Sequence, residues 1–266
     1  KAYTFENFLQ KKYVGQKRFS LEGGESLIPA IDFLINIAAD KGVEDVVIGM
    51  SHRGRLNTLV NILGKSSKDI FGEFDGKDYE EDIFDGDVKY HMGYGSKITT
   101  FSGKECSLYL APNPSHLEAV GPALQGFCRK RSEDTGSVDH TLPVLLHGDA
   151  SFAGQGIVAE TLNMSRLSSY STGGTIHIIT NNQIGFTTNP NDSRSCVYSS
   201  DISKVIRAPV FHVNADKPEA VAWVAKLALM FRRMYHQDVV IDLIGFRKYG
   251  HNETDEPGFT QPLLYK

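Results

Sequence analysis

The chain lacks any hydrophobic run long enough to cross a membrane. Its longest apolar stretches have the length of β-strands and are interrupted by Gly, Asp or Lys. A membrane helix needs roughly 20 consecutive apolar residues. The sequence therefore predicts no membrane span.

The chain also lacks an excess of positive charge. It carries 28 Lys and Arg residues against 32 Asp and Glu residues, and its net charge is -4. The sequence contains no long basic run or stripe, which is the usual mark of nucleic-acid-binding proteins. Both observations argue against nucleic acid as a partner.

Cysteine is scarce, with three residues in the whole chain. Cys106, Cys128 and Cys196 show neither metal-ligand spacing nor a CxxC pair. We interpret them as structural thiols of a protein in a reducing compartment.

The two ends of the chain show few features that are typical of protein termini. No signal or transit sequence precedes Lys1, and the last residues, TQPLLYK, have neither a helix stop nor the composition of a tail. We therefore expect the 266 residues to form one large domain that is a piece of a longer protein.

Strand-like and helix-like segments alternate along most of the chain. Apolar runs rich in β-branched residues, several of them continuous, predict strands buried on both faces, at 43–50, 105–111, 142–148, 175–181, 208–214 and 239–246. Helical patterns lie at 25–40, 55–64, 115–130, 154–168, 198–207 and 217–235. The alternation predicts an α/β fold with a doubly wound, mostly parallel sheet and helices on both faces.

One interval, at about 65–104, breaks this alternation. It is rich in Gly, Asp, Lys and Ser, and it contains the cluster VKYHMGYG. A connection of this length inside a compact domain is usually functional or partly disordered. Such a cluster is more specific than a linker requires, so we expect a long functional loop here.

Polar residues follow five of the predicted strands where each strand ends. In open α/β sheets, ligands bind beyond the carboxyl ends of the strands. Helix caps and turns explain any one of these residues, but they explain the whole set less easily. The segments are 51–55, 113–117, 148–151, 181–184 and 247–255.

Two of these strand ends offer oxygen ligands. Asp149 ends the run LPVLLHGD and Asn182 ends the run TIHIITNN, so both side chains should emerge at one edge of a parallel sheet. The carbonyl of Ile184, in a bending loop, can serve as a third ligand. Such oxygens suit Mg²⁺, which leaves positions open for phosphates. The structural alternative is that Asp149 caps a helix and Asn182 starts a turn.

A competing motif lies between the same two residues. Residues 154–159 match G-x-G-x-x-A, the dinucleotide-binding fingerprint. That fingerprint should follow its strand at once and be answered by an acidic residue about 20 positions later. Here the glycines begin several residues after the strand, and the next strand ends in TNN. The pattern disfavours NAD binding.

Many segments together resemble a known family. GD at one strand end and NN about 30 residues later resemble the diphosphate-binding motif of thiamine diphosphate enzymes. Nearly the whole chain is similar to the E1 component of 2-oxoglutarate dehydrogenase, through KRFSLEGGESLIP, SHRGRLNTLVNILGK, GDVKYHMGYG, NPSHLEAV, HGDASFAGQGIVAETLNMS, NNQIGFTT, HVNADKPEAV and GHNETDEPGFTQPLLYK. A match in so many independent segments is far more specific than GD and NN alone.

The resemblance implies the thiamine diphosphate-binding fold and an oxidative decarboxylation of 2-oxoglutarate with succinyl transfer to a lipoyl group. It implies thiamine diphosphate and Mg²⁺ as cofactors, and a lipoyl-bearing acyltransferase component as a partner. It also implies a homodimer formed through a remainder of the chain outside this sequence. Bacterial cytoplasm and mitochondrial matrix are both compatible with it.

The resemblance assigns cofactor-binding roles to individual residues. Asp149, Asn182 and the carbonyl of Ile184 would hold Mg²⁺ on the diphosphate, and Arg53 would pair with the diphosphate itself. The remaining positions are Ser115 and Leu117, which line the cofactor pocket in relatives, Ala150 and Ser151, whose backbone N–H groups at a helix start suit phosphate, and His251, a loop histidine near the diphosphate.

Three further residues match positions that contact the 2-oxo acid: Phe19, His52 and His91. The two histidines are the catalytic candidates, because a modest pKa shift moves the charge state of histidine across pH 7. The structural alternative for His52 and His91 is that each histidine caps a loop. For His116, a place on the first turn of a helix explains the residue as well as a role in the site does.

The histidines within predicted strands have a different interpretation. His147, His177 and His212 lie inside apolar runs. We interpret these three as core or packing residues.

The sequence departs from the family at one position. After HMGY the family commonly has a hydroxyl residue that helps to bind the substrate, whereas Gly95 stands here and Ser96 follows. Selectivity between 2-oxoglutarate and 2-oxoadipate stays open, since a methylene is worth about 1–3 kcal/mol of discrimination.

The family also needs a glutamate that activates the aminopyrimidine ring, and that residue belongs to another domain. Neither Glu118 nor Glu160 is marked by the sequence as that residue, so we expect the 266 residues to be inactive alone. The alternatives are a 2-oxoadipate dehydrogenase, a non-oxidative 2-oxoglutarate decarboxylase, an NAD-linked dehydrogenase and a non-catalytic α/β assembly domain.

Overall fold

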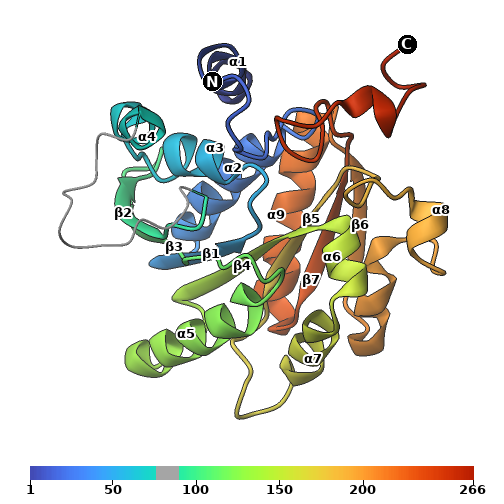
Figure 1. Ribbon diagram of the computed structural model, residues 1–266. Helices are drawn as coiled ribbons and strands as arrows, with labels where there is room; N and C mark the ends of the chain where they lie inside the picture. The colour runs from blue at the N-terminus through green and yellow to red at the C-terminus, as the bar shows by residue number, and fades with distance from the viewer. Residues whose placement is uncertain (76–89) are drawn as a thin grey trace.

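A computed structural model describes residues 1–75 and 90–266 of the chain. In the described residues, seven strands form one sheet in the order β2-β3-β1-β4-β5-β7-β6 (Figure 1). All neighbouring strands pair in parallel except β2 with β3. The strands are β1 (Asp45–Met50), β2 (Tyr94–Thr99), β3 (Glu105–Leu110), β4 (Thr141–Gly148), β5 (Ile176–Asn181), β6 (Val210–Asn214) and β7 (Val239–Ile244).

Helices cover both faces of the sheet (Figure 1). One face carries α2 (Leu27–Asp40) and α9 (Pro218–Tyr235), with α1 (Ala2–Lys12), α3 (Arg55–Asn61) and α4 (Ser67–Asp75) beside them. The other face carries α5 (Val120–Thr135), α6 (Asp149–Gly154), α7 (Gly156–Met164) and the 3₁₀ helix η1 (Ser199–Ile206). Two short helices, α8 (Pro190–Ser193) and η2 (Pro257–Phe259), lie in loops.

The central strands form because their side chains are buried on both faces. In β1, Val46 and Ile48 pack in the large core with α2 and α9, while Val47 packs with Leu124 of α5 on the opposite face. Successive side chains of a strand point to opposite faces, so a strand covered on both sides needs a continuous apolar run. The predicted doubly wound α/β fold is confirmed.

The interval at about 65–104 is more regular than the sequence suggested. Its first part holds α4 and its last part holds β2, while 76–89 lie outside the described residues. β2 escaped prediction because it is an edge strand that buries one side only: Tyr94 and Ile98 pack against the core, and Lys97 is exposed. An alternating polar strand has no apolar run to recognise.

Other predicted boundaries differ in detail. The helix expected at 115–130 begins at Val120, and the one expected at 154–168 is preceded by a separate helix, α6, that ends at Gly154. The segment expected to be helical at 198–207 is 3₁₀. Residues 115–119 are consequently free to form a turn at the carboxyl edge of the sheet.

A buried arginine ties α9 to the amino edge of the sheet. Arg232 is fully buried, and its guanidinium donates to the carbonyls of Gly174, Val138, Thr141 and Thr172 at 2.7–3.2 Å. Val138 lies in the loop before β4 and Thr141 begins that strand, while Thr172 and Gly174 lie in the loop before β5. The arginine therefore holds together the edge of the sheet that lies away from the strands' carboxyl ends.

We expect Arg232→Met to lower the free energy of unfolding by about 3 kcal/mol or more, since it leaves several buried carbonyls without a donor. Arg166→Met is the matched control, because Arg166 is exposed and its guanidinium donates to the side chain of Gln237. Pulse proteolysis in urea measures both variants. Equal midpoints for the two would contradict the role given to Arg232.

Candidate functional site

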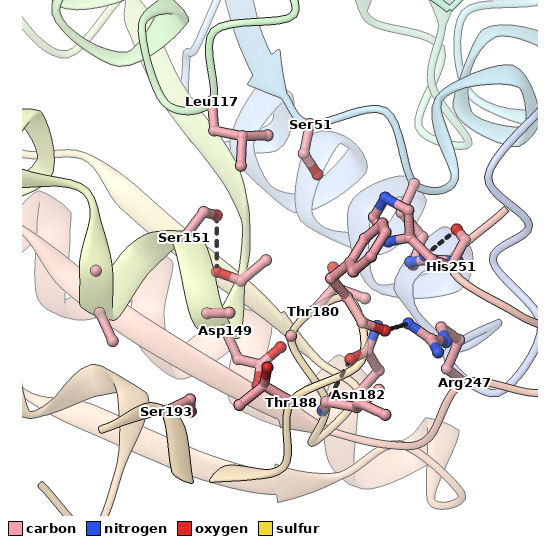
Figure 2. A pocket seen from close by; sticks show the side chains of 18 of the residues that line it. Ser51, Leu117, Asp149, Ser151, Thr180, Asn182, Thr188, Ser193, Arg247 and His251 are labelled. Atoms are coloured by element: carbon pink, nitrogen blue, oxygen red, sulfur yellow. Dashed lines mark hydrogen bonds between the residues drawn. The ribbon is translucent and has the colours of Figure 1, made fainter. Parts of the chain in front are cut away.

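A cavity of about 730 Å³ opens where β1, β4 and β5 end. Ser51 follows β1, Gly148 ends β4, and Thr180 lies near the end of β5. In Figure 2, Asp149, Asn182 and Thr188 lie below Ser51 and Leu117. The volume is within the range of about 300–1,000 Å³ that is usual for ligand pockets.

The cavity brings together eleven of the twelve residues predicted to form the site. Those that line it are Phe19, His52, Arg53, Ser115, Leu117, Asp149, Ala150, Ser151, Asn182, Ile184 and His251. The twelfth, His91, does not line the cavity, but its Nε2 lies 3.0 Å from the hydroxyl of Ser115. Its ring centroid lies 5.0 Å from that of His52.

Asp149 and Asn182 stand at the ends of neighbouring parallel strands, because Gly148 pairs with Thr180. Asp149 is the first residue of α6 and is 3% exposed. Burial raises its pKa to about 6, although backbone N–H groups and Arg194 oppose that shift. A carboxylate buried in this way is stabilised by a bound cation.

The loop after β5 presents further oxygens. The side chain of Asn182 accepts a bond from the N–H of Ile184, and Gln183 between them has a positive φ of 61°. This left-handed turn bends the chain sharply. Within 1–75 and 90–266, no donor reaches the carbonyl of Ile184, so it remains available to a ligand.

These oxygens fit a hard cation. A carboxylate, an amide oxygen and a backbone carbonyl form a ligand set that suits Mg²⁺ and leaves positions for phosphate. The described part of the chain contains no group of three or more His, Cys, Asp or Glu side chains able to hold a metal. A transition-metal site built from such side chains is therefore not found there.

Two fixed arginines give the cavity a positive wall. Arg53 donates to the carbonyls of Ser20 and His251 at 2.8 and 2.9 Å. Arg247 donates to the carbonyls of Tyr249 and Phe186 at 3.1 and 2.8 Å. Burial and the charge of Arg247 lower the pKa of Arg53 to about 10, so Arg53 stays protonated near pH 7. Such a wall suits an anionic ligand.

His52 lies in a cluster of aromatic rings. Its ring centroid is 5.2 Å from that of Phe19 and 4.9 Å from that of Tyr90. It makes a hydrogen bond with the carbonyl of Pro114, while its buried Nε2 has no partner in the described structure. Burial, His91 and Arg55 lower its pKa to about 4, so His52 is neutral at pH 7.

His251 closes the same wall. Its ring packs edge-on against Phe19 and Phe186 at 5.5 and 4.5 Å. Burial, Arg53 and Arg247 lower its pKa to about 4. His251 therefore meets a ligand as a neutral ring.

The sequence did not reveal the role of Glu253. Its carboxylate accepts the backbone N–H groups of Arg18, Phe19 and Ser20 at 2.7, 3.1 and 2.8 Å. Phe19 itself has a positive φ of 53°, an uncommon conformation for an aromatic residue. Glu253 thus holds Phe19 at the cavity from the other end of the chain.

Glu118 was also passed over. It lies in the turn before α5 with a positive φ of 69°, and its carboxylate bonds to Nδ1 of His147 at 2.6 Å and to the hydroxyl of Ser151 at 2.5 Å. His147 Nε2 continues to His177 Nδ1 at 3.0 Å, and His177 Nε2 to Asp238 at 3.3 Å. Burial opposes its ionisation, but His147 and Ser151 hold the pKa of Glu118 below its ordinary value.

The histidines in strands fall into two groups. His147 and His177 are buried, as the packing interpretation requires, and both rings contact Phe152. His212 is different, because it is more than a third exposed and bonds to the buried Asp242 at 2.8 Å. His116 is exposed in the turn before α5 rather than in a helix.

Two other sequence features lie away from the cavity or its strand end. Ser96, the hydroxyl after Gly95, lines a separate groove with Tyr109 and Phe127 on the β2 side of the sheet, so it does not reach the cavity. Gly154 ends α6 and Gly156 begins α7, so neither lies in the turn directly after a strand. The position that the dinucleotide fingerprint requires is therefore not met.

We expect Glu118→Gln to loosen the turn at 115–118 and the start of α6, because it removes a charged acceptor shared by His147 and Ser151. A bond to a charged group is worth about 1.5–3 kcal/mol, so local amide exchange should accelerate roughly tenfold or more. Hydrogen–deuterium exchange measures it. Glu160→Gln, on the exposed side of α7, is the control and should exchange as the unsubstituted protein does.

The lowered pKa of His52 sets a pH dependence. Between pH 6.5 and 4 the unfolded chain binds a proton at this position and the folded chain does not, so stability falls as the pH drops through that window. Exchange of the ring C2 hydrogen, followed by mass spectrometry, should give a midpoint near pH 4 for His52. A midpoint near the ordinary 6.5 would show that the ring is not desolvated as described.

Comparison with known proteins identifies the family of the chain. The model of the family described as "Dehydrogenase E1 component" matches residues 2–266. The chain is 57% identical over 268 residues to the 2-oxoglutarate dehydrogenase E1 component of Cupriavidus necator, covering 100% of this chain and 28% of that protein. It is 55% identical over 271 residues to the multifunctional 2-oxoglutarate metabolism enzyme of Mycolicibacterium vanbaalenii, covering 99% and 22%.

A third relative is the 2-oxoglutarate dehydrogenase E1/E2 component of Corynebacterium glutamicum, 54% identical over 270 residues, covering 100% of this chain and 22% of the relative. The chain thus spans about a quarter of the length of these relatives. In the described residues no helix is long and apolar enough to cross a membrane. The family model and the identities together show that the chain belongs to the dehydrogenase E1 component family.

Proposed function

We propose that the chain forms the diphosphate- and metal-binding domain of a thiamine diphosphate-dependent 2-oxoglutarate dehydrogenase E1 component. The observation that carries the proposal is the convergence of Asp149, Asn182 and Arg53 on one cavity at the carboxyl ends of the strands. The named activity of two relatives at 57% and 54% identity supports the same substrate class.

Three oxygens would hold Mg²⁺: the carboxylate of Asp149, the side-chain oxygen of Asn182 and the carbonyl of Ile184. Arg53 would pair with the diphosphate, and the neutral ring of His251 would lie beside it. The backbone N–H groups of Ala150 and Ser151, in the first turn of α6, have no helical carbonyl to bond to and would add donors, although that of Ala150 also faces the carboxylate of Asp149.

Thiamine diphosphate, once bound, supplies the carbon nucleophile and the electron sink that decarboxylation of a 2-oxo acid requires. The chain's own contribution is to orient and enclose it. Leu117, at 45% exposed, presents an apolar surface to the cavity, and Ser115 lies between the cavity and His91. Both would line the cofactor pocket.

His52 and His91 would act on the 2-oxo acid, with Phe19 packing against it. Nε2 of His52 is buried and has no hydrogen-bond partner in the described structure, so this atom is available to accept a proton from a bound substrate. Because the pKa of His52 is lowered to about 4, the ring would return that proton readily at pH 7. His91 is linked through Ser115 to the same wall. The aromatic cluster around His52 keeps water from this atom.

The remaining groups of the active site would come from other parts of the enzyme. Glu118 is engaged by His147 and Ser151, and Glu160 is exposed on α7, so neither presents a carboxylate to the cavity. We propose that the glutamate activating the aminopyrimidine lies outside these 266 residues, as do the homodimer contacts. Succinyl transfer to the lipoyl group of an acyltransferase component completes the proposed reaction.

Two related activities use the same site. A 2-oxoadipate dehydrogenase differs by one substrate methylene, and a non-oxidative 2-oxoglutarate decarboxylase differs in the acceptor. Gly95, at the position where the family commonly has a hydroxyl residue, lies on β2 and does not line the cavity. This position therefore gives no contact that would discriminate between 2-oxoglutarate and 2-oxoadipate. Comparative kinetics on both acids, with and without a lipoyl acceptor, separates the three activities.

We expect Asp149→Ala in the full-length enzyme to weaken Mg²⁺-dependent binding of thiamine diphosphate by at least about 100-fold, since loss of an outer partner alone costs roughly 10–100-fold. Isothermal titration calorimetry measures it. Asp134→Ala removes an exposed carboxylate near the end of α5 and should leave binding unchanged. Unchanged binding in Asp149→Ala would rule out the metal assignment.

A further inference from the structure

Arg194 brings a third guanidinium to the cavity, on a different element from Arg53 and Arg247. It follows α8 in the loop between β5 and η1, and its side chain is 11% exposed. Its Nη1 lies 3.8 Å from the carboxylate of Asp149. This cation therefore stands beside the carboxylate to which the proposed function assigns Mg²⁺.

The guanidinium of Arg194 is poorly satisfied. Its Nε is buried without a hydrogen-bond partner in the described structure, and Nη2 reaches the carbonyl of Val197 only at 3.5 Å. Good N–H···O bonds have lengths of about 2.7–3.2 Å. Arg53 and Arg247, by contrast, each make two bonds of 2.8–3.1 Å to backbone carbonyls.

Unused donors of a buried guanidinium are costly unless a ligand accepts them. Arginine carries five donors in a planar fork that matches phosphate oxygens. Arg194 is one of the residues that line the cavity, so an anion bound there lies within reach of its side chain. A divalent cation on Asp149 would meanwhile repel the guanidinium from the position it holds here.

We propose that Arg194 is an exchangeable ligand of the site: it pairs with Asp149 when no metal is bound, and it binds the diphosphate oxygens when Mg²⁺ takes Asp149. The inference rests on the proposed function and extends it by one residue. It makes the loop that carries Arg194 part of the diphosphate site.

The test uses Arg194→Gln in the full-length enzyme, because glutamine keeps a polar side chain and loses the charge. Arg166→Gln, which removes an exposed guanidinium bonded to Gln237, is the matched control. Mn²⁺ binding without cofactor is followed by electron paramagnetic resonance. Binding of thiamine diphosphate at saturating Mg²⁺ is followed by calorimetry.

The exchange predicts opposite effects on the two ligands. Without cofactor, Arg194→Gln should bind Mn²⁺ roughly three- to tenfold more tightly, because a competing cation is gone. With Mg²⁺ present, it should bind thiamine diphosphate roughly 10- to 100-fold more weakly, because charge-assisted bonds are lost. Arg194→Lys should recover part of the second loss and Arg166→Gln should change neither.

Cys196 gives an independent measure of the proposed exchange of partners by Arg194. It is exposed two residues after Arg194, while Cys106 and Cys128 are buried. Its alkylation rate, measured by mass spectrometry of the peptide, should change when Mg²⁺ and cofactor bind, and this change should be lost in Arg194→Gln.

Two results overturn the inference. If Arg194→Gln alters neither affinity, Arg194 is not a ligand, and if it weakens both, Arg194 only supports the loop. Failure of the unsubstituted enzyme to bind thiamine diphosphate with Mg²⁺ would instead overturn the proposed function, and the inference with it.

Discussion

The parallel pairing of β4 with β5 is the constraint on which the cavity depends. Because Gly148 lies opposite Thr180, the residues that follow the two strands leave the sheet at the same edge. A slip of one residue would turn the side chains of one strand to the other face. Side chains of β4 and β5 are packed on both faces of the sheet, so a slip would lose that packing, and the core on either side also positions Asp149 and Asn182.

The loops that surround the cavity above the sheet are held in place by buried carboxylates. Glu253 holds Phe19 across 234 residues of sequence, and Glu118 holds Ser151 across 33. Glu253 accepts backbone hydrogens of the turn at Phe19, which has a positive φ. Glu118 itself has a positive φ, and its carboxylate ties its turn to His147 of β4 and Ser151 of α6. The cavity is thus shaped by few strong polar contacts, while the sheet beneath it is shaped by many weak apolar ones.

The charged side chains at the cavity carry an excess of positive charge. A single buried carboxylate, Asp149, faces three guanidinium groups, and two of these are fixed by backbone carbonyls. The excess of positive charge suits a polyanion such as a diphosphate, and the lone carboxylate suits a divalent cation that accompanies it. The neutral rings of His52 and His251 add no charge to this balance near pH 7.

The sequence by itself determined the doubly wound sheet, because strands covered on both faces must be apolar throughout, and the family, because many motifs match at once. It also marked Asp149 and Asn182, since strand ends in such a sheet share an edge. It could not mark β2, whose pattern alternates, or Glu118 and Glu253, whose partners lie elsewhere in the chain. Only the tertiary structure decided that Ser96 faces another groove and that Arg194 stands against Asp149, because contacts between loops depend on how the strands bring their ends together.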